Sequence, residues 1–264
     1  MSREPASPPA APLRCGVSVV VPCYGSEHSV GLVVAQLREV LARGGIAFEI
    51  VLVDDASRDR TGAVVDELAA ACPEVTAIHL ARNYGQHAAL LCGIRAARFD
   101  VVVTIDDDLQ HPPDQVPRLL AALTEDVDVV YGPAEREPHG VVRGLASRAA
   151  KWLLQVPMGR TARTLSALRV FRTRLRDQFA AIRGPFVSID VLLARATDRI
   201  TAVTVRHDAR TIGASTYTLR KLLVHAVTMM AGRLAWAGRG LDRPAYVVRS
   251  TSRGGEPTIG SPTG

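Results

Sequence analysis

The sequence has few aromatic residues, few cysteines and no long uncharged run. Aromatic residues make up 5% of its 264 residues, too few for a protein that stacks nucleic-acid bases on aromatic side chains. The four cysteines lack the paired spacing of a metal site, so we expect small buried side chains in a reducing cytoplasm. No uncharged run exceeds twelve residues. Because spanning a bilayer takes roughly 18 to 20, we expect no integral membrane protein.

The N-terminal residues contain four prolines but no apolar core of a signal peptide. We therefore expect residues 1–14 to form a disordered arm and the protein to stay inside the cell. Hydrophobic residues at 47% and charged residues at 22% are typical of a globular domain. The net charge of +6 and the pI near 9.5 favour anionic partners such as phosphates, a nucleotide or a membrane surface.

Strand and helix patterns alternate through the first half of the chain. Short β-branched runs predict strands at 17–22, 46–53, 75–80, 101–105 and 127–131. The sequence predicts helices at 29–43, where apolar residues recur at helical spacing, at 57–71 with a cap at Ser57, and after the third strand up to about Arg98. This alternation predicts an α/β fold, a mostly parallel sheet flanked by helices, with ligands at the carboxyl ends of the strands.

The second half of the chain predicts further elements of the same domain. These are strands at 166–171 and 200–206 and helices near 143–155 and 172–195. A basic, amphipathic helix is predicted over 217–240, and its pattern fits a membrane surface and packing on protein equally well. We expect one domain over 15–216, then this helix, and a disordered tail over 241–264 that is rich in Gly, Ser, Thr and Pro.

Three carboxylates follow the strand predicted at 101–105. Asp106, Asp107 and Asp108 would repel one another unless a cation or hydrogen-bond donors offset their charge. Hard oxygen ligands at the alternate positions Asp106 and Asp108 favour Mg²⁺ or Mn²⁺, bound in turn to a diphosphate. A solvated acidic turn or a helix cap is the alternative. Strand ends are nevertheless where ligands bind in such sheets, which favours the metal.

Asp54 and Asp55 end the second predicted strand in the same way. Their carboxylates can accept hydrogen bonds from a base or a ribose hydroxyl, whereas a helix cap explains Ser57 but not Asp54. The sequence contains neither a G-x-G-x-x-G run after its first strand nor a G-x4-G-K-[S/T] run, which disfavours dinucleotide oxidoreductases and P-loop enzymes. We therefore expect a nucleotide held by carboxylates and a metal ion.

Five segments in order resemble one known family. They are Val17–Tyr24, Val53–Ser57, Arg82–His87, Asp106–Pro113 and His207–Tyr217. Together, over about residues 17–230, they resemble family 2 glycosyltransferases of the GT-A fold, in the branch of dolichyl-phosphate mannose synthase and undecaprenyl-phosphate 4-deoxy-4-formamido-arabinose transferase. The resemblance implies inverting transfer of a sugar from a UDP- or GDP-linked donor to a polyprenyl phosphate, with Mg²⁺ or Mn²⁺ as cofactor and no nucleic-acid partner.

The resemblance also implies roles for single residues. The expected sugar-nucleotide site comprises Pro22, Tyr24, Glu27, Asp54, Asp55, Arg82, Gln86, Asp106 and Asp107. The expected metal site comprises Asp106, Asp108 and Gln110. The expected catalytic residues are Asp108, Arg136 and Arg210, and the expected acceptor-binding residues are Arg136, Arg143, Arg210 and Ser215.

Two positions depart from the family pattern. Glu27 lies one position later than the glutamate that follows the first strand in family members, so it reaches the nucleotide only if the loop shifts. Thr216 stands where the family has a lysine after Ser215, which removes a cation near the expected acceptor phosphate.

The stretch from 136 to 176 contains ten Lys or Arg residues and a single acid, Glu137. A phosphate acceptor is already anionic at neutral pH and needs cations more than a general base. This favours a lipid phosphate, met at the cytoplasmic face of the membrane. If the acceptor is instead a hydroxyl of a soluble compound, Asp190 is the candidate base. A sugar-nucleotide binder without activity is the third alternative.

Overall fold

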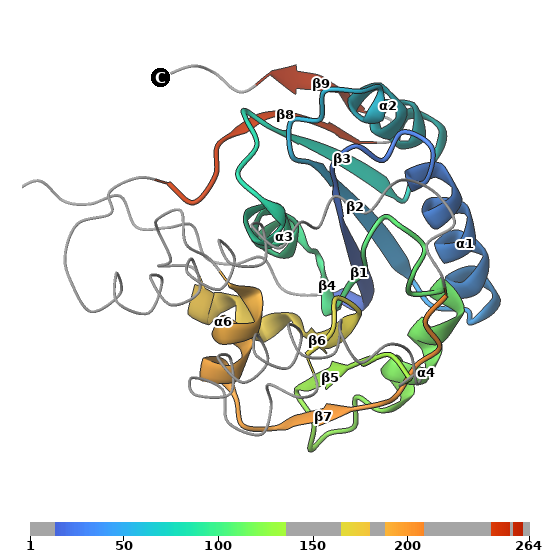
Figure 1. The fold of residues 1–264 in the computed structure, drawn as a ribbon, viewed down its shortest axis with the longest axis vertical. Helices are drawn as coiled ribbons and strands as arrows, with labels where there is room; N and C mark the ends of the chain where they lie inside the picture. The colour runs from blue at the N-terminus through green and yellow to red at the C-terminus, as the bar shows by residue number, and fades with distance from the viewer. Residues whose placement is uncertain (1–13, 136–164, 180–187, 209–243, 254–255, 261–264) are drawn as a thin grey trace, which may run out of the picture.

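The computed structural model describes residues 14–135, 165–179, 188–208, 244–253 and 256–260. Within these ranges nine strands form one sheet, in the order β7-β5-β6-β4-β1-β2-β3-β8-β9, which crosses the molecule in Figure 1. The strands are β1 (Arg14–Cys23), β2 (Phe48–Asp54), β3 (Val75–Leu80), β4 (Phe99–Thr104), β5 (Val129–Tyr131), β6 (Arg169–Arg172), β7 (Ile200–Ala202), β8 (Val248–Arg253) and β9 (Glu256–Gly260).

The centre of the sheet is parallel. β1 pairs in parallel with β2 on one side and β4 on the other, and β2 pairs in parallel with β3. β6 pairs antiparallel with both β4 and β5, and β8 pairs antiparallel with β3. The mostly parallel sheet expected from the sequence is confirmed, and the carboxyl ends of β1, β2 and β4 lie at one edge, here called the carboxyl edge.

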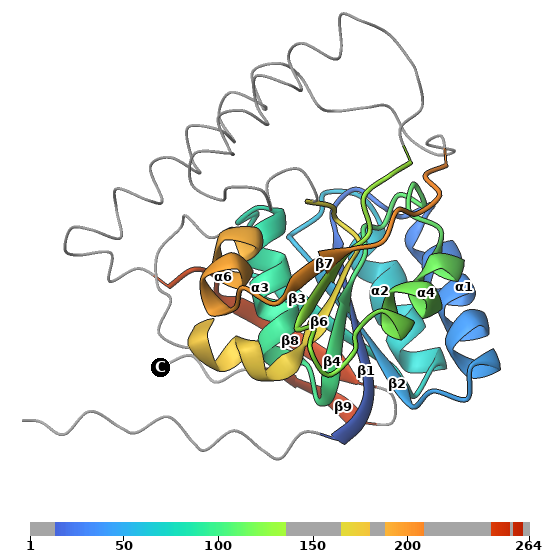
Figure 2. The same cartoon turned by 90° about the horizontal axis from the view of Figure 1, so that it is seen from below.

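Helices cover both faces of the sheet. They are α1 (Val30–Arg43), α2 (Thr61–Ala71), α3 (Gln86–Ala96), α4 (Val116–Ala121) and α6 (Ile189–Ala196), with short 3₁₀ turns η1 (Pro113–Gln115) and η3 (Thr173–Phe179). Figure 2 shows α1, α2 and α4 on one face and α3 and α6 on the other. This arrangement explains why the central strands read as unbroken apolar runs, since both of their faces are buried.

Side chains of β1 alternate between two cores. Val19 and Val21 pack in the core under α1 and α2, whereas Val20 packs in the core under α3. The α1 residues that enter the first core follow the helical spacing expected from the sequence: Val30, Val33, Val34, Leu37 and Leu41. Because opposite faces of one strand contact different helices, β1 ties the two layers together.

Two expected features of the helices are wrong. Ser57 does not cap α2, which begins at Thr61; the Ser57 hydroxyl instead accepts a hydrogen bond from the Gly25 amide at 3.3 Å. The helix expected over 172–195 is not continuous, because the described residues form η3 and, after a gap, α6. Ser188, directly before α6, has an extended backbone, with φ of -127° and ψ of 112°.

The expectation of a disordered tail over 241–264 does not hold for the described residues 244–253 and 256–260. β8 pairs with β3 along its length and β9 pairs with β8, so this segment extends the sheet. Tyr246 contacts α3, where the Arg95 guanidinium lies 5.6 Å from the centre of its ring. Serine and threonine side chains tolerate a strand whose two faces are only partly buried, which composition alone did not reveal.

Some expected elements lie outside the described residues. These are the arm at 1–13, the helix near 143–155 and the amphipathic helix over 217–240. In the part of the chain that the structure describes, no helix has the length and apolar character required to cross a bilayer.

Candidate active site

The segments that follow β1, β2 and β4 meet at the carboxyl edge. The parallel register sets Cys23, at the end of β1, beside Asp54, at the end of β2. The loops after β1 and β4 are joined directly, because the Tyr24 amide donates a hydrogen bond to Oδ2 of Asp107 at 3.2 Å. The sheet therefore brings the two carboxylate motifs together, as expected for ligand binding in this fold.

Asp106 carries a carboxylate in negatively charged surroundings. The pKa of Asp106 is raised to about 7, mainly by burial and also by the nearby carboxylates of Asp108 and Asp107. Arg169 and a hydrogen bond from Gln86 act in the opposite direction. The Gln86 amide nitrogen donates to Oδ1 of Asp106 at 2.7 Å, which ties the start of α3 to the end of β4. A cation at this position would relieve the repulsion among the carboxylates.

Asp107 holds the loop after β1. Its carboxylate accepts the Tyr24 amide, and burial raises the pKa of Asp107 while that hydrogen bond offsets part of the rise. The middle carboxylate of the motif is therefore engaged by the protein itself. Asp106 and Asp108 accept one such bond each as well, from Gln86 and from the Gln110 amide.

Asp108 begins a tight turn. Oδ1 of Asp108 accepts a hydrogen bond from the Gln110 amide at 3.1 Å, across Leu109, whose φ of 60° lies in the left-handed region. Within the described ranges, no three His, Cys, Asp or Glu side chains are grouped so as to hold a metal ion. Asp106 and Asp108 thus offer a partial set of oxygen ligands. Such a set fits Mg²⁺ or Mn²⁺, because Mg²⁺ in particular takes its remaining ligands from water and substrate phosphates.

Two histidines lie beside this turn. The rings of His111 and His207 meet edge to face with 4.9 Å between their centres, and Nε2 of His111 lies 3.2 Å from the Ser166 hydroxyl. Burial, together with His207, lowers the pKa of His111 to about 4, so its ring is neutral at physiological pH. Sequence reasoning did not single out this pair, although both residues belong to segments that carry the family resemblance.

Asp54 is 3% exposed and has two protein partners. Its Oδ1 accepts a hydrogen bond from the Ser57 amide at 3.0 Å, and its Oδ2 lies 3.2 Å from Nδ1 of His79. Sequence reasoning did not identify His79, because the only unusual feature of this residue is that it is polar within an apolar strand. The carboxylate expected to contact the nucleotide is therefore held from two sides.

Asp55 holds the loop between β3 and α3. Its two carboxylate oxygens accept the amides of Tyr84 and Gly85, each at 2.7 Å. Gly85 has a φ of 91°, which a residue with a side chain rarely adopts, so the glycine allows the turn into α3. Burial raises the pKa of Asp55, and the two amides offset part of that rise. Asp55 thus shapes the loop that carries Gln86.

Three further residues of the expected sugar-nucleotide site lie around the same edge. Pro22 is buried near the end of β1, and the Tyr24 side chain just beyond it is 53% exposed. The guanidinium of Arg82 lies 4.7 Å from the centre of the Tyr84 ring. An exposed aromatic and a cation at the carboxyl edge suit a base and a diphosphate.

Glu27 supports the start of α2. Its Oε2 accepts a hydrogen bond from the Arg60 amide at 2.9 Å, and its Oε1 lies 3.3 Å from Nε2 of His28. The position of Glu27, one residue later than in the family pattern, thus coincides with a contact to α2 within the protein.

The expected acceptor-binding residues are not covered by the structure. Arg136, Arg143, Arg210 and Ser215 all lie outside the described residues. Their roles remain predictions.

A buried ion pair lies near Asp106. The Arg169 Nη1 is 2.8 Å from Oδ1 of Asp190, which also accepts a hydrogen bond from the Tyr131 hydroxyl at 3.1 Å. Arg169 and Asp190 are 3% and 7% exposed. The carboxylate of Asp190 is thus paired with a cation and shielded from solvent. Sequence reasoning missed Arg169, whose signal was a cation at the start of an apolar strand.

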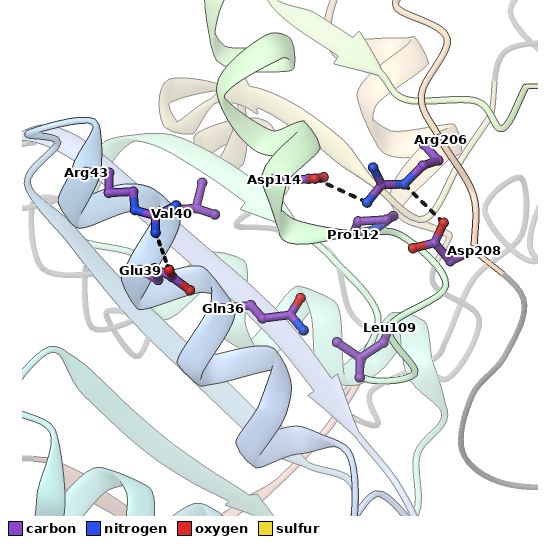
Figure 3. Close-up of a pocket in the computed structure, with 9 residues that line it drawn as sticks. All are labelled: Gln36, Glu39, Val40, Arg43, Leu109, Pro112, Asp114, Arg206 and Asp208. Carbon is purple, nitrogen blue, oxygen red and sulfur yellow. Dashed lines mark hydrogen bonds and ion pairs between the residues drawn. The ribbon is translucent and has the colours of Figure 1, made fainter.

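A separate pocket of about 350 Å³ lies beside α1. Figure 3 shows it between α1 and the segment from Leu109 to Asp114, with Arg206 paired to Asp114 and Asp208. None of the residues expected to bind the nucleotide sugar or the metal lines it. The pocket is therefore distinct from the carboxylate site.

Comparison with known proteins agrees with this geometry. Residues 18–178 match the family model described as Glycosyl transferase family 2. The undecaprenyl-phosphate 4-deoxy-4-formamido-L-arabinose transferase of Pectobacterium atrosepticum is 32% identical over 210 residues, which cover 78% of this chain and 64% of that protein. The protein of the same name from Pseudomonas aeruginosa (strain LESB58) is 35% identical over 213 residues, covering 78% and 62%. The match thus spans less than two thirds of the length of these relatives.

Solved structures share the fold. Mannosyl-3-phosphoglycerate synthase from Rubrobacter xylanophilus superposes with a TM-score of 0.60 at 20% identity, covering 86% of this chain and 77% of that one. Glucosyl-3-phosphoglycerate synthase from Mycobacterium tuberculosis, in complex with Mn²⁺ and UDP-glucose, gives a TM-score of 0.62 at 20% identity, covering 89% and 86%. The family model covers more than half of the chain and the curated relatives exceed 30% identity, so this chain belongs to glycosyltransferase family 2.

Proposed function

We propose that this protein transfers a sugar, with inversion, from a nucleotide-sugar donor to a polyprenyl phosphate. The observation that carries the proposal is the convergence of Asp54 and the Asp106–Asp108 motif at the carboxyl edge. In support of the acceptor, the curated relatives are named undecaprenyl-phosphate sugar transferases.

The donor would lie across the ends of β1, β2 and β4. In this position Asp54 and Tyr24 would contact the nucleotide, and Arg82 and the loop up to Gln86 would border its phosphates and sugar. Asp106 and Asp108 would hold Mg²⁺ or Mn²⁺, and the bound cation would neutralise charge on the departing nucleoside diphosphate. A solved neighbour in complex with Mn²⁺ and UDP-glucose supports a divalent cation.

The partners of Asp190 favour a phosphate acceptor over a hydroxyl acceptor. A hydroxyl needs a general base, and Asp190 was the candidate for that role. Its ion pair with Arg169 and its hydrogen bond from Tyr131 instead give Asp190 a structural role, in holding these two side chains together. A phosphate monoester is already anionic, so it needs cations such as those of the stretch from 136 to 176.

With this acceptor, sugar transfer would take place at the cytoplasmic face of the membrane. Its phosphate lies at the membrane surface while its polyprenyl chain stays in the bilayer, so a peripheral association would bring the two together. The basic stretch from 136 to 176 supports contact with anionic headgroups.

The test is release of nucleoside diphosphate from a panel of UDP- and GDP-sugars with Mn²⁺, with and without undecaprenyl phosphate. We expect release that depends on the lipid phosphate and on one donor. Release that ignores the lipid and follows a hydroxyl acceptor would contradict the proposal, and binding without any release would support the sugar-nucleotide binder.

Asp108→Asn is expected to lower transfer by more than about a hundred-fold. Losing even an outer partner of a metal ligand costs 10 to 100-fold, and Asp108 is an expected ligand. The asparagine oxygen can still accept the Gln110 amide, so the fold should persist. Asp126→Asn, at an exposed residue near the opposite end of β5, is the matched control and should transfer as wild type. Full activity of Asp108→Asn with an unchanged melting temperature would refute the assignment.

A further inference from the structure

His79 lies on β3 with its ring between two carboxylates. The register pairs it with Asp54 of β2, and its Nδ1 lies 3.2 Å from Oδ2 of that residue. On the other side, its Nε2 lies 3.0 Å from Oδ1 of Asp66 on α2. The side chains of His79 and Asp54 are 2% and 4% exposed, and that of Asp66 is 50% exposed. The ring thus connects a buried carboxylate at the carboxyl edge with one at the surface.

Both carboxylates receive a hydrogen bond from His79 only when its ring carries two protons. A neutral imidazole has a single N–H and would present a lone pair to the second carboxylate. The hydrogen bond to Asp54 raises the pKa of His79, burial opposes the rise, and Asp66 adds to it. Geometry and charge therefore both favour the imidazolium form.

These contacts fix the direction of the Asp54 carboxylate. One oxygen faces His79 and the other accepts the Ser57 amide. Burial raises the pKa of Asp54, but the hydrogen bonds from His79 and Ser57 outweigh it and lower the pKa below its usual value. Each carboxylate oxygen can accept a further hydrogen bond, so Asp54 retains acceptor capacity in an orientation that is already set.

The C-terminal strand supports the same arrangement. The Ser252 hydroxyl of β8 donates to Oδ1 of Asp66 at 3.0 Å. The titratable groups that face His79 are therefore Asp54 from β2 and Asp66 from α2, while β8 adds a hydroxyl that does not titrate near neutral pH.

We propose that His79 is a positioning residue for the donor nucleotide: held by Asp66, which the Ser252 hydroxyl contacts in turn, it sets the Asp54 carboxylate for a hydrogen bond from the base or ribose. This inference rests on the proposed function, since it assigns Asp54 to the donor. The inference goes beyond the proposed function because it names a buried residue that sets donor affinity without contacting the substrate itself.

The experiment measures binding of UDP and of GDP, each with Mg²⁺, by calorimetry between pH 5.5 and 8.5. Relative to a His79→Asn variant, whose side chain has no charge to lose, we expect the wild-type affinity to fall about ten-fold as the pH rises and His79 loses its charge, because a hydrogen bond to a charged group is weakened. Asp66→Asn removes one of the two charges that hold the proton on His79. At this half-exposed position the fold should survive, and the loss of affinity should move to lower pH.

Two substitutions of His79 separate positioning from packing. The amide of His79→Asn can take the place of Nδ1 and still reach Asp54, so its affinity at pH 6 should stay within about two-fold of wild type and should lack the fall that His79 causes at higher pH. The amide of His79→Gln reaches toward Asp66 instead, so it should bind about ten-fold more weakly at pH 6.

The outcomes are distinguishable. Equal affinity of wild type and His79→Gln, or a profile that Asp66→Asn leaves unshifted, would overturn the inference while the proposed function stands. The ionisation of UDP and that of Asp106, whose pKa is raised to about 7, are common to all the proteins and cancel in the comparison. A wild type that binds neither UDP nor GDP would contradict the proposed function, and the role of His79 with it.

Discussion

At the carboxyl edge, five aspartates differ in what their oxygens contact. Asp55 and Asp107 accept backbone amides of neighbouring loops. Asp54 pairs with a buried histidine, and Asp106 accepts a glutamine amide. Asp108 caps its own turn. Side chains of the same chemistry thus have different roles: Asp55 and Asp107 hold the neighbouring loops, and the other three are the candidates for ligand contacts.

Asp55→Asn tests the loop-holding role at this scale. The asparagine oxygen can accept one of the amides of Tyr84 and Gly85, but its NH₂ group would face the other N–H. A buried donor left without an acceptor costs about 1 to 3 kcal/mol of the free energy of unfolding. We expect that loss in urea unfolding, together with a higher KM for the donor and a smaller change in kcat.

The matched control for this prediction is Asp59→Asn. Asp59 is exposed and accepts the Thr61 amide near the start of α2, which an asparagine oxygen can also do. It should change stability by less than about 0.5 kcal/mol, as surface substitutions usually do. If Asp55→Asn behaved like this control, the loop would not depend on the Asp55 carboxylate.

At the scale of single residues, the sequence located the acids but not their partners. A run of carboxylates after an apolar strand is visible in the sequence, because strand ends follow from the apolar pattern. Which oxygen accepts which amide depends on loops that approach from elsewhere in the chain. For the same reason His79 and Arg169 were missed, since their carboxylate partners lie on other elements.

At the scale of elements, α3 packs closely against the sheet at a glycine. A Cβ added to Gly93 would lie 2.3 Å from Cγ1 of Val20 on β1 and 3.2 Å from Cγ2 of Val53 on β2. Both neighbours are short β-branched side chains in a buried core, so neither can swing away. The absence of a side chain at Gly93 sets the distance between helix and sheet.

Gly93→Ala is therefore expected to destabilise the protein by about 1 to 3 kcal/mol, the usual cost of overpacking. Gly31→Ala is the matched control, because Gly31 lies in α1 with open space where its Cβ would be. There alanine should stabilise by about 0.5 to 1 kcal/mol through its higher helix propensity. Urea unfolding of both variants measures the contrast, and equal effects would show that α3 does not pack as described.

Elements with strong apolar patterns were predicted well, and those defined by distant pairing were not. The five strands of the first half and the helix at 29–43 match the structure closely, because buried strands and amphipathic helices carry local patterns. β8 and β9 carry no such pattern, since a partly exposed strand rich in Ser and Thr resembles a loop in composition.

At the scale of the whole molecule, the C-terminal segment covers the β3 edge of the parallel sheet. β8 pairs with β3 over Thr76 to Leu80, and Ala245 before it is buried in the core under α3. Without this segment β3 would present unpaired backbone groups, which promotes pairing between molecules.

A chain that ends at residue 243 is expected to lose several kcal/mol of unfolding free energy, at roughly 1 kcal/mol for each lost backbone hydrogen bond. It should also associate at high concentration through the exposed β3. A chain that ends at Arg253 keeps β8 paired with β3 and should therefore lose less unfolding free energy. Urea unfolding and light scattering measure these differences, and equal stability of the two chains would contradict a structural role for β8.

The α/β class, the parallel centre of the sheet, the family and the positions of the acidic motifs could all be predicted from the amino-acid sequence. These follow from local apolar periodicity and from residues that are contiguous in the chain. Three features became visible in the fold alone: the C-terminal segment joins the sheet, Asp190 is paired with Arg169, and His79 connects Asp54 to Asp66. The reason is physical: hydrogen bonds and ion pairs between distant segments depend on how strands are ordered and helices packed, and no local pattern encodes that order.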